Sequence, residues 1–285
     1  MTVDVIDHIA PLAERHDAFL FDLWGVVHNG LEAYPGALRT LAALKAQDKH
    51  VLLLSNAPRL GTVVDPFLAK MGVDRAHYDR VVASGDLVRQ ALELGTIDVG
   101  RRFLYWGKGP DRTITEGLDF EEVGSVDAAD FILCGGLNND ETESVADYGD
   151  VLARANARGL PMVCANPDYE VMRGTQMLPC AGALAQAYQD IGGKVHWFGK
   201  PYPVAYEYCR HVLGDIAPDR VLAVGDTLRT DIAGCTAAGI KGVLVTGGIH
   251  AREVMPGGEL DRAALERICA EADLWPAAAM TQLDW

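Results

Sequence analysis

Four short apolar runs of the sequence are each followed at once by polar or charged residues. AFLF leads into DLWGVV, HVLLL into SN, VHWF into GKP, and VLAV into GDTLRTD. Runs of this length and composition predict strands buried in a sheet. In an open parallel sheet, ligands bind beyond the carboxyl ends of the strands. The side chains expected at that edge are Asp22, Ser55, Asn56, Lys200, Asp226 and Asp231.

These groups together suit a phosphate ester. A phosphoryl group carries dispersed negative charge and needs a cation, hydrogen-bond donors and an in-line nucleophile. Asp22 and Asp226 offer the hard oxygen ligands that Mg²⁺ prefers, while Lys200 and Ser55 can bind phosphate oxygens. Attack of the Asp22 carboxylate on phosphorus would form an aspartyl-phosphate. Each residue alone has a plainer role, as a helix cap or a solvated loop residue, but the combination favours a site.

An alternation of strands and helices must position these residues. The pattern begins near the N-terminus and returns in the last third of the chain. It predicts a parallel sheet with helical crossovers. The predicted strands are 18–23, 50–54, 195–198, 220–224 and 241–245, and the predicted helices are 36–47, 60–71, 202–213, 231–238 and 261–272.

A second α/β stretch lies between these two blocks. Its predicted strands are 102–106, 130–134 and 161–165, and its predicted helices are 86–94, 141–157 and 181–191. Because it has apolar strands of its own, we expect it to form a separate core. The predicted organisation is one α/β domain of residues 1–81 and 181–285, with a second α/β domain of residues 82–180 inserted into it.

Composition narrows the class of protein. A formal net charge of −15 argues against a nucleic-acid-binding surface. The six cysteines show no CxxC spacing and sit mostly in apolar runs, which predicts reduced, buried thiols. The N-terminal residues do not resemble a signal peptide, and no run reaches the roughly 20 apolar residues of a membrane span. We therefore expect a cytoplasmic protein without membrane or nucleic-acid partners.

The order of these motifs resembles that of the haloacid dehalogenase (HAD) superfamily, and more closely its subclass IIA phosphatases, similar to NagD and 4-nitrophenylphosphatase. Further similar stretches are ANPD at 165–168, LPCAGALAQA at 178–187 and GIKGVLVTGG at 239–248. The resemblance implies a Rossmann-like core with an inserted cap domain of the C2a type. It also implies Mg²⁺-dependent hydrolysis of a small phosphorylated metabolite, and it leaves a homodimer open.

The resemblance also assigns roles to single residues. It implies that Asp22 is the nucleophile and a Mg²⁺ ligand. The further metal-site residues that it implies are the backbone carbonyl of Trp24, the carboxylate of Asp226 and, in a supporting position, Asp231. Ser55 and Lys200 would bind the transferring phosphoryl group, Lys200 would also orient Asp22, and the backbone near Asn56 would add donors. Asn166 and Asp168 would face the substrate.

One position departs from the family pattern. The family's phosphatases carry a general acid and base Asp two residues after the nucleophile, where this sequence has Trp24. An indole cannot exchange a proton near pH 7, and such assistance contributes about 10²–10⁴-fold in rate. Three explanations stay open. His28 could replace the acid, the substrate could carry a good leaving group, or the protein could be a weak catalyst that binds a phosphorylated ligand.

Rival functions find less support in the sequence. DLWGVV lacks the GxGxxG of dinucleotide-binding enzymes, WGKGP and FGKP lack the Ser or Thr of a P-loop, and there is no GxSxG elbow. Two alternatives remain. One is a metal-free dehalogenase-type hydrolase that uses Asp22, against which Asp226 and Asp231 count. The other is a catalytically weak binding or regulatory protein, which Trp24 keeps open.

Overall fold

The computed structural model describes residues 2–173 and 176–285. The chain divides into two compact units. Unit 1 comprises Met1–Ser55, Val64–Val82 and Lys200–Trp285, and unit 2 comprises Asn56–Val63 and Ala83–Gly199. Each unit contains its own parallel sheet, which confirms the predicted α/β class with a second sheet inserted into the first unit.

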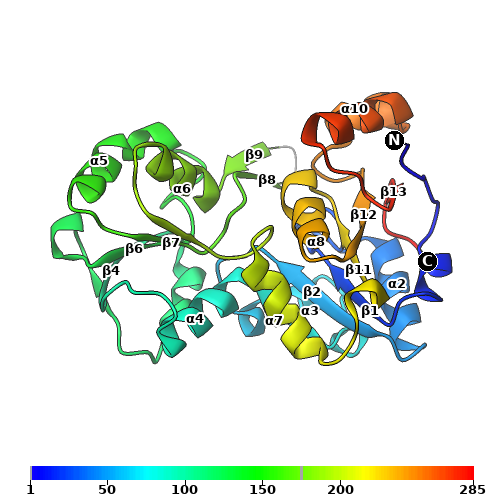
Figure 1. Cartoon of the computed structure of the whole chain (residues 1–285), viewed down its shortest axis with the longest axis horizontal. Coiled ribbons are helices and arrows are strands. Elements are labelled where there is room, and N and C mark those ends of the chain that lie inside the picture. Colours follow the sequence, from blue (N-terminus) through cyan, green and yellow to red (C-terminus); the bar gives the residue numbers. More distant parts are fainter. Residues whose placement is uncertain (1, 174–175) are drawn as a thin grey trace. The chain divides into compact units, whose positions relative to one another are not determined.

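Unit 1 is built on a parallel six-stranded sheet with the order β13-β12-β11-β1-β2-β3 (Figure 1). The strands are β1 (Ala18–Phe21), β2 (His50–Ser55), β3 (Arg80–Ala83), β11 (Val221–Gly225), β12 (Lys241–Val245) and β13 (Ala278–Met280). β1 lies between β11 and β2, and Phe21 is in register with Val224 on one side and Leu53 on the other. The loops after β1 and β11 therefore leave the sheet next to each other.

The central strand is buried on both faces. Phe19 and Phe21 belong to a core that includes Leu41 and Leu44, and Leu20 points to the opposite face. Full burial of each such side chain stabilises the fold by roughly 1.5–3 kcal/mol. The helices of unit 1 are α1 (Ala10–Ala13), α2 (Pro35–Lys45), α3 (Gly61–Lys70), which starts in unit 2, α7 (Pro203–Leu213), α8 (Ala233–Ala237), α9 (Ala251–Val254) and α10 (Arg262–Ala272).

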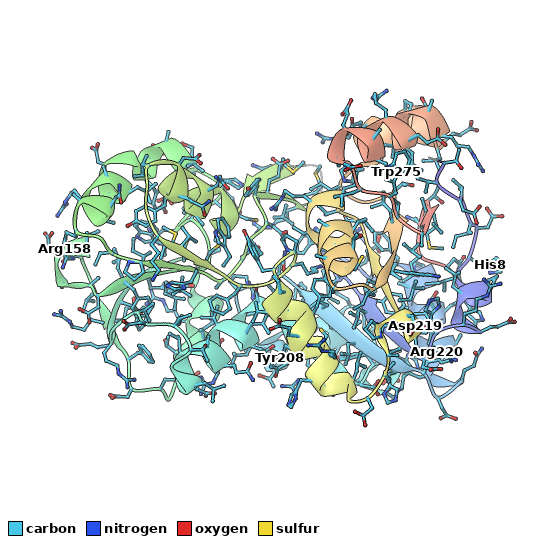
Figure 2. The ribbon with its side chains drawn as sticks, in the orientation of Figure 1. His8, Arg158, Tyr208, Asp219, Arg220 and Trp275 are labelled. Atoms are coloured by element: carbon cyan, nitrogen blue, oxygen red, sulfur yellow. The ribbon has the colours of Figure 1, made fainter. Side chains whose placement is uncertain are left out.

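Ion pairs fix the other end of the central strands. Arg220, labelled beside Asp219 in Figure 2, immediately precedes β11. Its guanidinium donates two hydrogen bonds of 2.7 Å to the Asp17 carboxylate, which immediately precedes β1. Hydrogen bonding from Arg220 lowers the pKa of Asp17. The pair links the residues that precede β1 and β11, at the end of these strands opposite to Asp22 and Asp226.

Unit 2 is built on a parallel five-stranded sheet with the order β10-β7-β6-β4-β5. Its strands are β4 (Arg102–Trp106), β5 (Glu121–Val123), β6 (Phe131–Cys134), β7 (Met162–Cys164) and β10 (Val195–Trp197), and β8 (Glu170–Arg173) pairs antiparallel with β9 (Gln176–Pro179). Its helices are α4 (Ser84–Leu94), α5 (Gly149–Ala157) and α6 (Ala181–Asp190). Leu152 of α5 and Leu184 of α6 share a core with Ile132 and Met162.

Several sequence predictions need correction. The strand at 195–198, expected in the sheet of unit 1, is β10, and it pairs with β7 in the sheet of unit 2. The inserted domain was predicted over 82–180. Unit 2 instead consists of Asn56–Val63 and Ala83–Gly199. The helix predicted over 141–157 is α-helical only from Gly149, after a 3₁₀ turn at Val145–Tyr148. The helix predicted over 231–238 begins as a π-helical turn at Leu228–Ile232.

Two predictions about the chain's chemistry can be checked directly. All six cysteines are buried free thiols, as predicted. Within residues 2–173 and 176–285, no helix is both long enough and apolar enough to cross a membrane.

Candidate active site

Asp22 follows β1 directly and is held at the edge of the sheet. Its backbone N–H donates to the carbonyl of Val224 at 2.8 Å, which continues the pairing of β1 with β11 by one residue. The chain then turns at Gly25, whose φ is +82°. A Cβ on Gly25 would lie 2.1 Å from Oδ2 of Asp226, so only glycine lets this loop approach the second strand end. Asp22 and Asp226 are thereby brought to one place.

Asp226 follows β11 and accepts two hydrogen bonds. The Thr227 hydroxyl donates to its Oδ1 and the Ile249 backbone N–H donates to its Oδ2, each at 2.9 Å. Gly248, in the loop after β12, permits the second contact because a Cβ there would lie 2.1 Å from Oδ2 of Asp226. The orientation of this carboxylate is therefore set by two neighbouring strand ends.

Asp231 lies in the π-helical turn at Leu228–Ile232, here called η6. Its Oδ2 accepts the backbone N–H of Thr227 at 3.1 Å. Its side chain lies over Gly225, where a Cβ would stand 2.1 Å from the Asp231 carboxyl carbon. The wide turn thus folds the Asp231 carboxylate back towards the end of β11.

Lys200 connects two of these carboxylates. Its Nζ lies 2.5 Å from Oδ1 of Asp22 and 2.7 Å from Oδ1 of Asp231. The sequence placed Lys200 at the end of a strand of the same sheet, but the preceding strand, β10, belongs to the sheet of unit 2. Lys200 opens the segment of unit 1 that leads into α7. The predicted meeting of Lys200 with Asp22 is observed, and the predicted reason for it was wrong.

The charges of this cluster do not balance. Oxygen atoms of Asp22, Asp226 and Asp231 all lie within 4.8 Å of one another, with a single lysine among them. Burial raises the pKa of Asp22 well above its usual range, Asp231 and Asp226 add to the effect, and Lys200 opposes it. Burial and Asp231 also raise the pKa of Asp226 to about 7. These three residues could hold a metal ion, and an all-oxygen donor set with two excess negative charges fits a hard divalent cation.

Exposure distinguishes Asp22 from its neighbours. Its side chain is 11% exposed, whereas those of Lys200 and Asp231 are 4% and 6% exposed. Both oxygens of Asp231 accept hydrogen bonds, from Lys200 and from Thr227. Of the two carboxylates that contact Lys200, Asp22 is therefore the more accessible one. Asp231 is the more buried one, and its hydrogen bonds place it to support the cluster.

Trp24 and His28 pack together in the loop that follows Asp22. Their ring centroids are 5.3 Å apart in an edge-on arrangement, and Phe67 packs on the His28 ring at 6.0 Å. His28 is buried, and its Nδ1 accepts the backbone N–H of Gly30 at 3.0 Å. Burial lowers the pKa of His28 to about 4, so its imidazole is neutral at pH 7. Trp24 lies over Gly30, where a Cβ would stand 2.6 Å from the indole.

The remaining predicted residues lie in two places. Ser55 ends β2 in unit 1. Asn56, Asn166 and Asp168 belong to unit 2 and bind one another. The Asn56 amide donates to Asp168 at 2.9 Å, and the Asp168 backbone N–H donates to the Asn166 side chain at 3.0 Å. Within unit 1 the structure brings Asp22, Lys200, Asp226 and Asp231 into direct contact or close range. Within unit 2 it joins Asn56, Asn166 and Asp168 by hydrogen bonds.

Sequence reasoning missed Thr227, Ile249 and His250. Thr227 and Ile249 hold the Asp226 carboxylate, and His250 accepts a hydrogen bond from Leu228 beside it. The contact made by Ile249 uses its backbone, so its side-chain type carries no signal. The two consecutive glycines before Ile249 are the one cue, because they indicate a close backbone approach.

Two family profiles match parts of the chain. The profile described as haloacid dehalogenase-like hydrolase matches residues 19–121, and the one described as HAD-hydrolase-like matches residues 197–268. Among solved structures, a haloacid dehalogenase-like hydrolase from Brucella suis 1330 is similar over 98% of this chain and 100% of its own, with 34% identity and a TM-score of 0.86.

Two characterised relatives are similar over most of this chain. Ribonucleotide monophosphatase NagD of Escherichia coli (strain K12) is 28% identical, covering 80% of this chain and 86% of its own. D-glycerol 3-phosphate phosphatase of Mycobacterium tuberculosis is 27% identical, covering 84% of this chain and 65% of its own. The chain belongs to the haloacid dehalogenase-like hydrolases. Within that family it falls in the group of phosphatases that includes NagD and 4-nitrophenylphosphatase, which confirms the resemblance found in the sequence.

Proposed function

We propose that the protein is a Mg²⁺-dependent phosphatase that hydrolyses a small phosphorylated metabolite through an aspartyl-phosphate at Asp22. The observation that carries the proposal is the position of Asp22. Its carboxylate stands at the end of the central strand, keeps 11% of its side-chain surface exposed, and contacts Lys200 at 2.5 Å. A nucleophile needs this combination of a fixed direction and an accessible oxygen.

The residues of the cluster divide the chemistry between them. An Asp22 oxygen attacks phosphorus, the P–O bond to the leaving group breaks, and the leaving oxygen takes the electron pair. Water then cleaves the aspartyl-phosphate to give phosphate and free Asp22. Mg²⁺, held by Asp22, Asp226 and the Trp24 carbonyl and supported by Asp231, would neutralise charge on the phosphoryl group. Lys200 orients Asp22, and Lys200 and Ser55 bind phosphoryl oxygens.

Trp24 restricts the leaving group. Its indole N–H does not ionise near pH 7. His28 is a poor replacement, since its pKa is lowered to about 4 and its Nδ1 is occupied by the Gly30 N–H. A leaving oxygen therefore departs without a proton from either side chain. Of the three explanations for Trp24, a substrate with a good leaving group has the most support. Acyl phosphates, aryl phosphates and phosphoanhydrides belong to this class.

The relatives support the size of the substrate but not its identity. One is described as a ribonucleotide monophosphatase and the other as a D-glycerol 3-phosphate phosphatase, and the two substrates share little beyond a phosphate on a small molecule. We propose a substrate of that size, with Asn56, Asn166 and Asp168 as its further contacts.

We also propose a cytoplasmic enzyme, as the six free thiols suit a reducing compartment, and a homodimer, which light scattering would test.

A second candidate is a catalytically weak protein that binds a phosphorylated ligand. Trp24 favours it, because losing acid and base assistance costs about 10²–10⁴-fold in rate without removing phosphate binding. A metal-free dehalogenase finds less support, since Asp226 and Asp231 lie with Asp22 in a cluster suited to a cation.

One experiment tests these alternatives together. Hydrolysis of a series of aryl and alkyl phosphates is measured with Mg²⁺, for wild type and Asp22→Asn. We expect the wild-type rate to fall steeply as the leaving-group pKa rises, and Asp22→Asn to lose activity throughout the series. Mg²⁺-independent turnover would contradict the metal site. Tight phosphate binding without turnover of even the most activated aryl phosphate would favour the binding protein.

A further inference from the structure

The backbone of η6 leaves donors that need partners. The first N–H groups of any helical turn have no acceptor within the helix. Leu228 is buried, so an unsatisfied N–H there would destabilise the turn. The N–H of Thr227 donates to the Asp231 carboxylate at 3.1 Å, and the N–H of Leu228 donates to Nε2 of His250 at 3.3 Å. One donor is thus satisfied by Asp231 itself and the next by His250.

His250 belongs to the loop that also holds Asp226. The neighbouring residue, Ile249, donates its backbone N–H to Oδ2 of Asp226 at 2.9 Å. The His250 carbonyl accepts the N–H groups of Glu253 and Val254, at 2.9 and 3.0 Å, which anchors the loop to α9. Two successive residues of this loop therefore contact the segment from Asp226 to Leu228, one through the backbone and one through the imidazole.

We infer that His250 is a positioning residue for the acidic cluster, acting through Leu228. Its imidazole fixes the first residue of η6, and η6 carries Asp231, whose carboxylate contacts Lys200 at 2.7 Å. His250 thereby sets the distance between Asp226, held by the loop after β12, and Asp231, held by the turn. Groups that orient metal-binding side chains in this indirect way typically change metal affinity by about 10–100-fold when they are removed.

The inference rests on the proposed metal site and makes a specific demand on the side chain. Nε2 of histidine is four bonds from Cα, as is the amide oxygen of glutamine, whereas that of asparagine is one bond closer. His250→Gln can therefore keep an acceptor for the Leu228 N–H, and His250→Asn cannot reach it. The two variants are matched in polarity and differ in reach.

Binding of Mn²⁺ alone, followed by its electron paramagnetic resonance signal, tests the inference without substrate. We expect His250→Asn to bind about tenfold or more weakly than wild type, and His250→Gln to remain within about threefold. Kinetically, the Mg²⁺ concentration for half-maximal activity should rise in His250→Asn, with the rate at saturating Mg²⁺ largely retained. Equal Mn²⁺ affinity in the two variants would overturn the inference.

Hydrogen exchange of the Leu228 amide gives a second test, and its wild-type measurement does not depend on a variant. In metal-free wild type we expect this amide to be protected, and its protection should be lost in His250→Asn and kept in His250→Gln. Rapid exchange in wild type would overturn the inference even if His250→Asn failed to fold. Absence of Mn²⁺ binding by wild type, with Leu228 protected, would instead contradict the proposed metal site.

Discussion

The polar residues beyond the strand ends of the two sheets differ in how their charges are balanced. In unit 1, Asp22, Asp226 and Asp231 share one lysine, Lys200, and are largely removed from solvent. In unit 2, Asp140 follows β6 and has two cationic partners, with Lys108 at 2.6 Å and Arg173 at 3.3 Å. Arg173 also pairs with Glu141 at 3.6 Å.

This difference shows that a position beyond the carboxyl end of a strand does not by itself identify an active site. Both sheets place charged side chains beyond the carboxyl ends of parallel strands. The cluster around Asp140 has equal numbers of carboxylates and cations, whereas the cluster around Asp22 has carboxylates in excess, with burial that keeps water from compensating them. A buried excess of negative charge calls for a cation, whereas the carboxylates of Asp140 and Glu141 already have theirs. Charge balance, and not position alone, identifies the candidate active site.

The largest expected contrast comes from removing one lysine from each unit. Lys200→Met leaves two buried carboxylates without their cation, which typically costs about 3–5 kcal/mol in unfolding free energy, and we expect activity to fall by about 10²–10³-fold. Lys108 is 40% exposed, so Lys108→Met should change stability by less than about 1 kcal/mol. Urea unfolding of both variants measures the difference. Similar losses of unfolding free energy in the two variants would contradict the proposed difference in charge balance between the two clusters.

A substitution at Trp24 tests whether the site of unit 1 lacks a general acid. Trp24→Asp places a carboxyl group two residues after the nucleophile. We expect it to raise the rate on alkyl phosphates by about a hundredfold, the lower range of general acid assistance, with little gain on activated aryl phosphates. Trp24→Asn is the matched control, since it has the same size without an ionisable proton. Equal rates for the two variants would show that acid assistance is not the missing component.

His28 tests the effect of burial in the same loop. Its pKa is lowered by burial to about 4 in the folded protein, against 6.5 when unfolded. Above pH 6.5 the His28 ring is neutral in both the folded and the unfolded chain, so it does not change the free energy of unfolding with pH. As pH falls from 6.5 to 4, only the unfolded chain takes up the proton, and the folded protein loses stability. The loss is roughly 3 kcal/mol. His28→Phe should flatten this pH dependence relative to wild type, whereas the exposed His211→Ala should leave it unchanged.

The smallest expected effect concerns protons that compete with the metal. Since burial and Asp231 raise the pKa of Asp226 to about 7, Asp226 is partly protonated at neutral pH without metal. We expect Mg²⁺ affinity to rise with pH, by up to about tenfold per pH unit below pH 7. Calorimetry at several pH values measures this. Asp140→Asn, in unit 2, should leave the titration unchanged, and a change there would mean that the binding carboxylates were misassigned.

Much of this architecture could be predicted because its signals are local. Strands buried on both faces appear as continuous apolar runs, and Asp22, Asp226 and Asp231 follow or lie near them. Lys200 shows the limit. Its motif predicted contact with Asp22, but the strand before it pairs in the other sheet, a choice made by tertiary packing that VHWF does not encode.

The supporting contacts of the site could not be predicted for a related reason. The Ile249 N–H reaches Asp226 because β12 lies beside β11, and the same loop brings His250 to Leu228, the first residue of the π-helical turn. Neither the strand order nor the π-helical turn has a residue signature in this sequence. Likewise, β13 consists of three small or flexible residues, and it is a strand because it pairs with β12.

Detection of a phosphoryl group on Asp22 tests the central claim most directly. The wild-type protein is mixed with Mg²⁺ and 4-nitrophenyl phosphate, quenched in acid within the first turnover, and its peptides are analysed by mass spectrometry. Because Trp24 provides no base for the attacking water, we predict that the intermediate accumulates, with one phosphoryl group on the peptide that contains Asp22 and none in Asp22→Asn. Turnover without a phosphorylated Asp22 peptide, or with undiminished rate in Asp22→Asn, would contradict the account.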